Sequence, residues 1–308
     1  MKILGLVLAF PIFINSVLGC ANITGSATSL SGTETKALRR SGVAELRYFL
    51  SKNLREDGIK MEASLRGSTN FNDRSDYSVA LMYLGRSKEA VALLQRLEQE
   101  RPGEYFVAAN LGTAHELSGN NEEALRWINE GIRRNPDSHA GTEWLHAQIL
   151  EAKILQQKDA DYFKKHSVLE LQADQIREEV TIGETKYSPE KLKEAIQHQL
   201  AERLQFVKPP DAPVAGLLFD YAAIEAATRT LESAKGLLQL AVEYGYPPDK
   251  VEPILKVYDK RIAWRKTKQY TRNTLIGIGV AAIAVFLLRA LYKRGIFVLS
   301  SKDLKRSR

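Results

Sequence analysis

The residues best suited to chemistry lie in one short segment, SHAGTEWLHAQILEAK, which holds two histidines and two glutamates. His139, Glu143 and His146 are spaced i, i+4, i+7, so on a single helix they would share one face. Two imidazoles and a carboxylate are a common ligand set for zinc. A second Glu-x-x-His is absent, and Glu194 with His198 is only a loose partner. A metal-dependent enzyme is therefore a minor alternative to a packed or solvated helix surface.

Other signatures of catalysis are missing from the sequence. It holds no P-loop and no GxGxxG, GxSxG, HExxH or CxxC motif. The single cysteine, Cys20, excludes an internal disulfide, and its place after an N-terminal apolar run argues against a catalytic thiol. The sequence therefore favours a non-catalytic protein that needs no cofactor.

A repeat with a period of 34 residues in the middle of the chain is the strongest structural signal. Residues of one type recur at this offset: Gly85 and Gly119, Ala90 and Ala124, Pro102 and Pro136. We expect the glycines to end a first helix with positive φ and the prolines to stop a second helix. The small alanines would let the two helices approach closely. The pattern predicts two helical hairpins over 71–136.

These positions resemble the tetratricopeptide repeat (TPR), because Leu111 and Gly112 also fall on that family's Leu-Gly pair. The tryptophan position of the family holds Arg74 and Ala108 instead. The resemblance implies an all-α fold, a TPR-like array of helical hairpins or α-solenoid. It also implies that the first helices of the units line a groove for extended peptides.

The resemblance assigns residues to that groove: Asn72, Ser75, Val79, Met82 and Tyr83 in the first unit, and Phe106, Asn110, Thr113 and Glu116 in the second. Asn110 matches a ligand-binding asparagine of members that bind chaperone tails, but Ser75 and Val79 replace the rest of that carboxylate clamp. Chaperone C-termini are therefore not the implied ligand. The alternative for these positions is plain surface or packing against a capping helix.

Two units are too few for a stable stack, so further helices are expected on both sides. Residues 37–70 are predicted to form N-terminal capping helices and 137–207 additional helices, the first of them over Ser138–Gln157. Within the latter, Glu178–Ser188 is interpreted as a linker. Residues 208–248 are predicted to form a degenerate TPR-like hairpin.

The N-terminal end has the form of an export signal. Residues 1–20 resemble a secretory signal peptide, and the Ser/Thr/Gly-rich stretch 21–36 is typical of a flexible tether. The sequence Val-Leu-Gly-Cys at 17–20 also resembles a bacterial lipobox, which would place a lipid on Cys20. Ordinary cleavage beside an incidental cysteine is the alternative.

The C-terminal end carries the membrane anchor that we expect. Thr274–Tyr292 is apolar except for Arg289, and about 20 helical residues cross a hydrocarbon core of about 30 Å. We predict a juxtamembrane helix over 249–273, a transmembrane helix over 274–292 and a basic tail over 293–308.

The formal net charge of +7 belongs to this end of the chain. Residues 259–308 hold 13 Lys/Arg against two Asp, whereas the remainder carries a net charge of −4. A mildly acidic main domain gives no electrostatic reason to expect nucleic-acid binding.

The sequence therefore predicts a membrane-anchored TPR adaptor or scaffold of the cell envelope, whose partners are other proteins or peptides. Its N-terminal domain would be exported, periplasmic or extracellular, and its tail cytoplasmic. The main alternative is a structural protein that assembles with copies of itself as a homo-oligomer.

Overall fold

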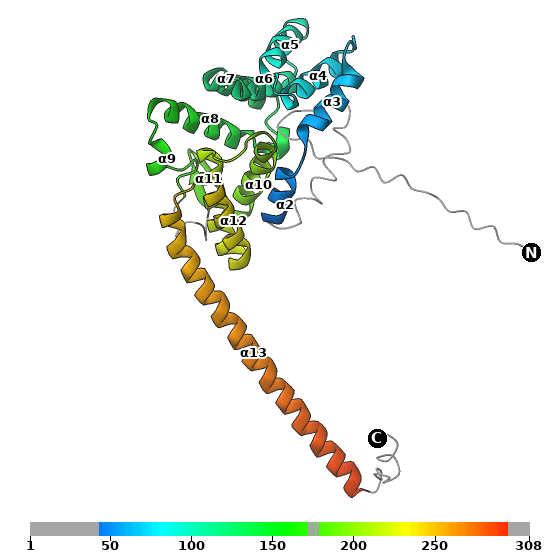
Figure 1. Ribbon diagram of the computed structural model, residues 1–308, viewed down its shortest axis with the longest axis vertical. Coiled ribbons are helices and arrows are strands. Elements are labelled where there is room, and N and C mark those ends of the chain that lie inside the picture. Colours follow the sequence, from blue (N-terminus) through cyan, green and yellow to red (C-terminus); the bar gives the residue numbers. More distant parts are fainter. Residues whose placement is uncertain (1–42, 172–175, 177–178, 295–308) are drawn as a thin grey trace, which may run out of the picture. The chain divides into compact units, whose positions relative to one another are not determined.

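The computed structural model describes residues 43–171, 176 and 179–294 (Figure 1). The expected signal peptide, the tether, Cys20 and the tail beyond Arg294 lie outside the described residues. In chain order the elements are α2 (Val43–Leu50), α3 (Leu54–Leu65), α4 (Phe71–Tyr83), α5 (Ser87–Glu100), α6 (Tyr105–Leu117), α7 (Asn121–Arg134), η1 (Ser138–Gly141), α8 (Glu143–Lys158), α9 (Tyr162–Lys165), β1 (Val180–Ile182), β2 (Thr185–Tyr187), α10 (Pro189–Phe206), α11 (Ala212–Thr228), α12 (Leu231–Glu243) and α13 (Pro248–Lys293).

The chain forms two compact units, one up to Glu252 and one from Pro253 onward. In the first unit consecutive helices pack against each other, as α4 with α5, α6 with α7, and α11 with α12 (Figure 1). The predicted all-α array of helical hairpins is therefore confirmed. The expected linker over Glu178–Ser188 is in part ordered, because β1 and β2 form an antiparallel pair with Val180 opposite Tyr187.

The two repeat units have the geometry that their spacing predicts. The pairs α4–α5 and α6–α7 begin 34 residues apart, at Phe71 and Tyr105. Gly85 and Gly119 have φ values of 75° and 86°, a left-handed conformation that glycine adopts without strain. The repeat's two alanine positions, 90 and 124, are fully buried where the paired helices meet.

Arg134 connects the two units at their outer helices. Its Nη2 and Nη1 atoms lie 2.7 and 2.8 Å from the two carboxylate oxygens of Glu98, and Nη1 also donates to the carbonyl oxygen of Glu104. The side chain of Arg134 is 10% exposed. A bidentate pair of this kind fixes the orientation of α7 against α5.

The prediction of a helix over Ser138–Gln157 is wrong at the start of this range. A short 3₁₀ turn, η1, precedes α8, and His139 and Ala140 have φ values of 49° and 57°. Gly141 continues this left-handed stretch with φ of 71°. Left-handed residues cannot continue a right-handed helix, so His139 does not share a helix face with the residues of α8.

Helix α10 packs on α2, α8 and α11 and contacts the ends of the repeat helices α4 and α6. Its last residue, Phe206, joins the apolar core of the repeats and lies 5.4 Å from the ring of Tyr83 at the end of α4. The inner helices of the repeats are thus covered at this end by the chain's own α10.

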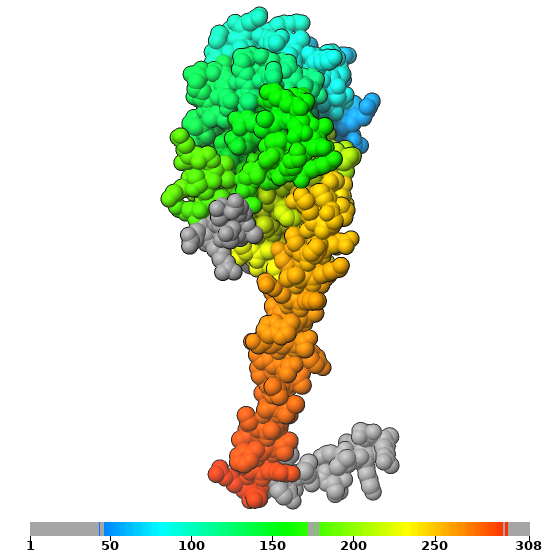
Figure 2. Space-filling model, turned by 90° about the vertical axis from the view of Figure 1, so that its left-hand side faces the viewer, coloured from blue at the N-terminus to red at the C-terminus, as the bar shows by residue number. Residues whose placement is uncertain are grey.

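The second unit contains most of α13, a single helix that runs without interruption through the predicted juxtamembrane and transmembrane segments. It is long and apolar enough to cross a membrane, and none of its apolar window is buried. Large apolar side chains such as Ile278, Ile283 and Phe286 are more than half exposed. Figure 2 shows the surface of this helix in orange to red. A bare apolar surface of this extent marks contact with lipid or with another apolar surface.

Candidate functional site

The predicted peptide-groove residues are mostly interior side chains. Six of the nine are buried: Ser75, Val79, Met82, Tyr83, Asn110 and Thr113. Phe106 and Glu116 are half-buried as whole residues, and Asn72 is exposed. Side chains without exposed surface offer no area to a peptide in this arrangement.

Asn110, the position singled out by the TPR resemblance, donates a hydrogen bond to the preceding repeat unit. Its side-chain amide donates to Ser75 Oγ at 3.4 Å, and both residues are fully buried. This contact links α6 to α4. Here Asn110 acts in the packing of one unit on the next.

Glu116 at the end of α6 joins three further side chains from two other helices. Its Oε1 lies 2.8 Å from Lys153 Nζ on α8 and 2.8 Å from Arg203 Nη1 on α10. Its Oε2 lies 2.8 Å from His146 Nε2. The Glu116 side chain is 8% exposed, so these are interior ion pairs.

The electrostatics of this group follow from its composition. Burial by itself raises the pKa of Glu116, but the charges of Arg203 and Lys153 outweigh it and hold the pKa well below its ordinary value. Burial lowers the pKa of His146, but hydrogen bonds to Glu116 and Glu143 outweigh it and raise the pKa. The two carboxylates therefore favour the imidazolium form of His146.

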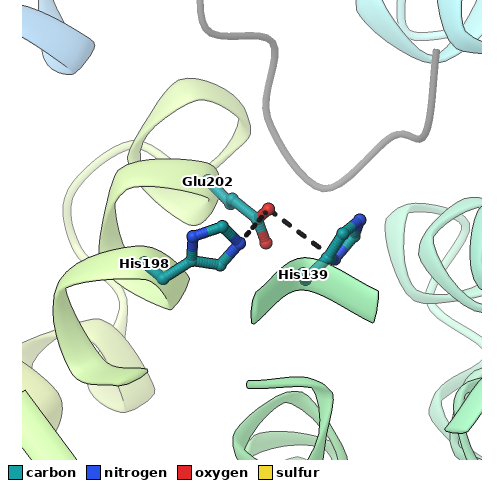
Figure 3. Close-up of side chains that lie close together, drawn as sticks. All are labelled: His139, His198 and Glu202. Carbon is teal, nitrogen blue, oxygen red and sulfur yellow. Dashed lines mark ion pairs between the residues drawn. The ribbon is translucent and has the colours of Figure 1, made fainter. Parts of the chain in front are cut away.

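A second polar cluster lies beside the first, between η1 and α10 (Figure 3). Glu202 Oε1 is 2.9 Å from His198 Nε2 and 3.7 Å from His139 Nδ1, so one carboxylate faces two imidazoles. The ligand atoms of the three residues all lie within 4.8 Å of one another. Their side chains are between 8% and 13% exposed.

The predicted trio of His139, Glu143 and His146 is therefore only partly brought together. Glu143 contacts His139 and also lies 3.4 Å from His146 Nδ1, but the other nitrogen of His146 faces Glu116. Sequence reasoning missed Glu202. The signal was available, since His198 and Glu202 are spaced i, i+4 on one helix and so share a face.

Both carboxylates of this cluster are anionic. Burial raises the pKa of Glu202, but the charges of His198 and His139 act more strongly and lower the pKa to about 2. Burial likewise opposes ionisation of Glu143, yet His139 and His146 hold its pKa far below the usual range. The cluster thus keeps two buried negative charges among imidazoles, an arrangement that can hold protons or a cation.

A cleft of about 680 Å³ opens beside this cluster, and His198 forms part of its wall. Trp144 and Tyr187 stack at one side of the cleft with ring centroids 4.5 Å apart. The lining also includes charged residues of both signs: Glu190, Lys191, Lys193, Glu194 and Arg229. The cleft therefore offers an aromatic platform with charges around it.

Comparison with known protein families, curated proteins and solved structures finds no match for this chain.

Proposed function

We propose that this chain is a membrane-anchored, non-catalytic adaptor whose TPR-like domain binds a partner protein outside the cytoplasm. The observation that carries the proposal is the combination, in one chain, of a helical-hairpin array and an exposed apolar helix, α13. Arrays of helical hairpins present extended surfaces that commonly bind proteins. The apolar part of α13 would hold this surface at a bilayer.

The cleft beside α10 is the surface that we assign to the partner. The inner faces of the repeat units are largely buried, whereas Lys191, Glu194 and Arg229 are exposed around the cleft. Aromatic side chains supply large contact areas and are enriched at protein interfaces. A polypeptide segment carrying both charge signs fits the Trp144–Tyr187 platform and its charged border.

Export of the N-terminal domain rests on the signal-like residues 1–20, and lipidation of Cys20 remains part of the proposal. The basic residues on both sides of the apolar segment would contact anionic headgroups, each worth about 1 kcal/mol near the surface.

Site-specific photocrosslinking in intact membranes tests the adaptor function. A photoreactive amino acid at position 191 or 229 should give an adduct with a different protein, identified by mass spectrometry. The same group at Gln99, exposed on α5, is the matched control and should give none. Replacing Trp144 with Ala should remove the adduct, because the aromatic platform is lost.

Two results would reject the adaptor function. An adduct made only of this chain's own peptides supports the self-assembling homo-oligomer instead. An adduct that is equally strong from Gln99, or unchanged by Trp144→Ala, means that the cleft does not select the partner. The helical circular dichroism of each variant shows whether its fold is intact.

A further inference from the structure

Two buried carboxylates converge on a single imidazole nitrogen. His139 Nδ1 is in contact with an oxygen of Glu143 and lies 3.7 Å from Oε1 of Glu202. One ring nitrogen carries at most one proton and can donate it to one of these oxygens. A metal ion in place of that proton can bind this nitrogen and an oxygen of each carboxylate at once.

The partners of the neighbouring carboxylates also favour a metal ion at this place. Arg203 and Lys153 reach Glu116, where two cations meet one carboxylate. Glu143 and Glu202 meet imidazoles, which are neutral unless protonated. The side chains that meet Glu143 and Glu202 are thus ones that can also ligate a metal ion, whereas the partners of Glu116 include two cations that cannot.

The distances suit a small transition-metal ion. Zinc lies about 2.0–2.1 Å from imidazole nitrogens and about 2.0–2.2 Å from carboxylate oxygens, so tetrahedral ligand atoms are about 3.3 Å apart. Glu202 Oε1 lies 2.9 and 3.7 Å from the two imidazole nitrogens, values on either side of that spacing. Small side-chain shifts would bring the three atoms onto one ion.

We propose that His139, His198 and Glu202 bind a divalent transition-metal ion of the zinc type, with Glu143 supplying the nearest fourth oxygen. Imidazole with carboxylate suits zinc among the common divalent ions. The ion would enter from the cleft, whose wall includes His198. Because His139 belongs to η1 and the other two to α10, the ion fastens the segment after the repeats onto α10 (Figure 3).

This inference does not depend on the adaptor function. An ion that fastens η1 to α10 adds stability whether or not the neighbouring cleft binds a partner. Photocrosslinking at the cleft and metal binding at the cluster can therefore fail separately.

Metal titration of the tag-free, full-length protein in detergent tests the proposal. After chelation and dialysis, Zn²⁺ should bind in a 1:1 ratio by calorimetry and raise the thermal midpoint. Co²⁺ should bind in its place and give the visible absorption bands of a four- or five-coordinate ion.

Graded losses are expected in four variants. His198→Gln and Glu202→Gln remove ligands and should weaken Zn²⁺ binding by more than about 100-fold. Glu143→Gln removes the charge of the fourth oxygen but keeps an amide oxygen in its place, and it should weaken binding by about 10–100-fold. His139→Asn tests the ligand on η1, because asparagine tolerates the positive φ of this position.

His166→Gln is the matched control. His166 Nδ1 lies 2.9 Å from Glu170 Oε1, a histidine–glutamate pair that is about half exposed at another place in the first unit. This variant should bind Zn²⁺ and Co²⁺ as the wild type does. Equal weakening in His166→Gln and His198→Gln would mean that the ion binds surface histidines, and the proposal would be wrong.

A measurement on the wild type alone covers the case in which the variants do not fold. Zn²⁺ should slow hydrogen exchange in peptides spanning 138–146 and 195–205 and leave 160–170 unchanged. Absence of a 1:1 Zn²⁺ complex, or uniform slowing across all peptides, would overturn the proposal.

Discussion

Glu116 joins α6 to α8 and α10 through one carboxylate, although the sequence suggested that it faces a peptide. Arg203 and Lys153 both lie 2.8 Å from its Oε1. Glu116→Gln keeps the shape of the side chain and leaves these two cations without their anion in the interior. We expect the free energy of unfolding to fall by about 3 kcal/mol or more, as when one partner of a buried ion pair is removed.

Denaturant unfolding of the full chain in detergent, followed by circular dichroism, measures this loss. Glu56→Gln is the control, because the Glu56–Lys60 pair on α3 is exposed and should contribute nothing measurable. Equal stability of Glu116→Gln and the wild type would show that the interior ion pairs are not important for the fold.

We expect Asp220 on α11 to make stability depend on pH. Burial and the negative charge of Glu170 raise its pKa to about 8, against about 3.9 in an unfolded chain. Between these values the folded state holds one proton more, so the free energy of unfolding falls as pH rises. The slope is about 1.4 kcal/mol per pH unit, which gives a loss of about 2 kcal/mol from pH 6 to 7.5.

Asp220→Asn cannot ionise and should remove this slope while retaining a similar side-chain shape. Unfolding titrations of both proteins at several pH values give the difference. Asp249→Asn, at an exposed position, should keep the wild-type profile. A parallel pH dependence in the wild type and Asp220→Asn would contradict the assignment.

At this scale the sequence predicts residue types well and their partners poorly. The positive φ values of Gly85 and Gly119 were predicted correctly, because the local turn after a helix is enough to require them. Glu202 was missed because its meeting with His139 depends on how α10 crosses η1, about 60 residues away along the chain. The residue pattern of a single helix does not indicate how that helix crosses another segment.

At the scale of elements, Gly112 sets how closely α6 and α7 pack. A Cβ atom at this position would lie 2.5 Å from Ile128 Cδ1 and 3.2 Å from the backbone nitrogen of Ile128. Gly112→Ala should therefore lower the free energy of unfolding by about 1–3 kcal/mol, despite alanine's higher helix propensity. Denaturant unfolding measures the change.

Gly216 on α11 provides the comparison for that substitution. A Cβ atom there would meet only Ser167, at an ordinary contact distance of 3.9 Å. Gly216→Ala should leave stability unchanged or raise it by up to about 1 kcal/mol. If Gly112→Ala were equally harmless, the close approach of α6 and α7 would not be a packing requirement.

The spacing of apolar residues predicts that a helix forms, whereas the residue at which the helix begins depends on its contacts with other parts of the chain. The hairpins over 71–136 agree with their prediction because each is decided by local spacing. The start of α8 differs, since His139 and Ala140 adopt left-handed angles that tertiary contacts must maintain. Contacts of η1 with α10 supply such a constraint.

At the scale of the whole molecule, the signal-like N-terminus and α13 together predict which ends of the chain lie on each side of the membrane. We expect the signal-like N-terminus to export the first unit and α13 to leave the C-terminal tail in the cytoplasm. In a bacterial host, green fluorescent protein fused after Arg308 should fluoresce, and alkaline phosphatase fused there should be inactive. The reverse pair of results would place the tail outside and reject this orientation.

The contact of α10 with the ends of α4 and α6 constrains how this gene can change. Repeat proteins with an open groove can alter inner-face residues one at a time and so acquire new ligands. Here Tyr83 packs on Phe206, and Glu116 pairs with Arg203, so a change at one position removes a contact of the other. Among descendants of this sequence, positions 83 and 206, and likewise 116 and 203, should vary in pairs.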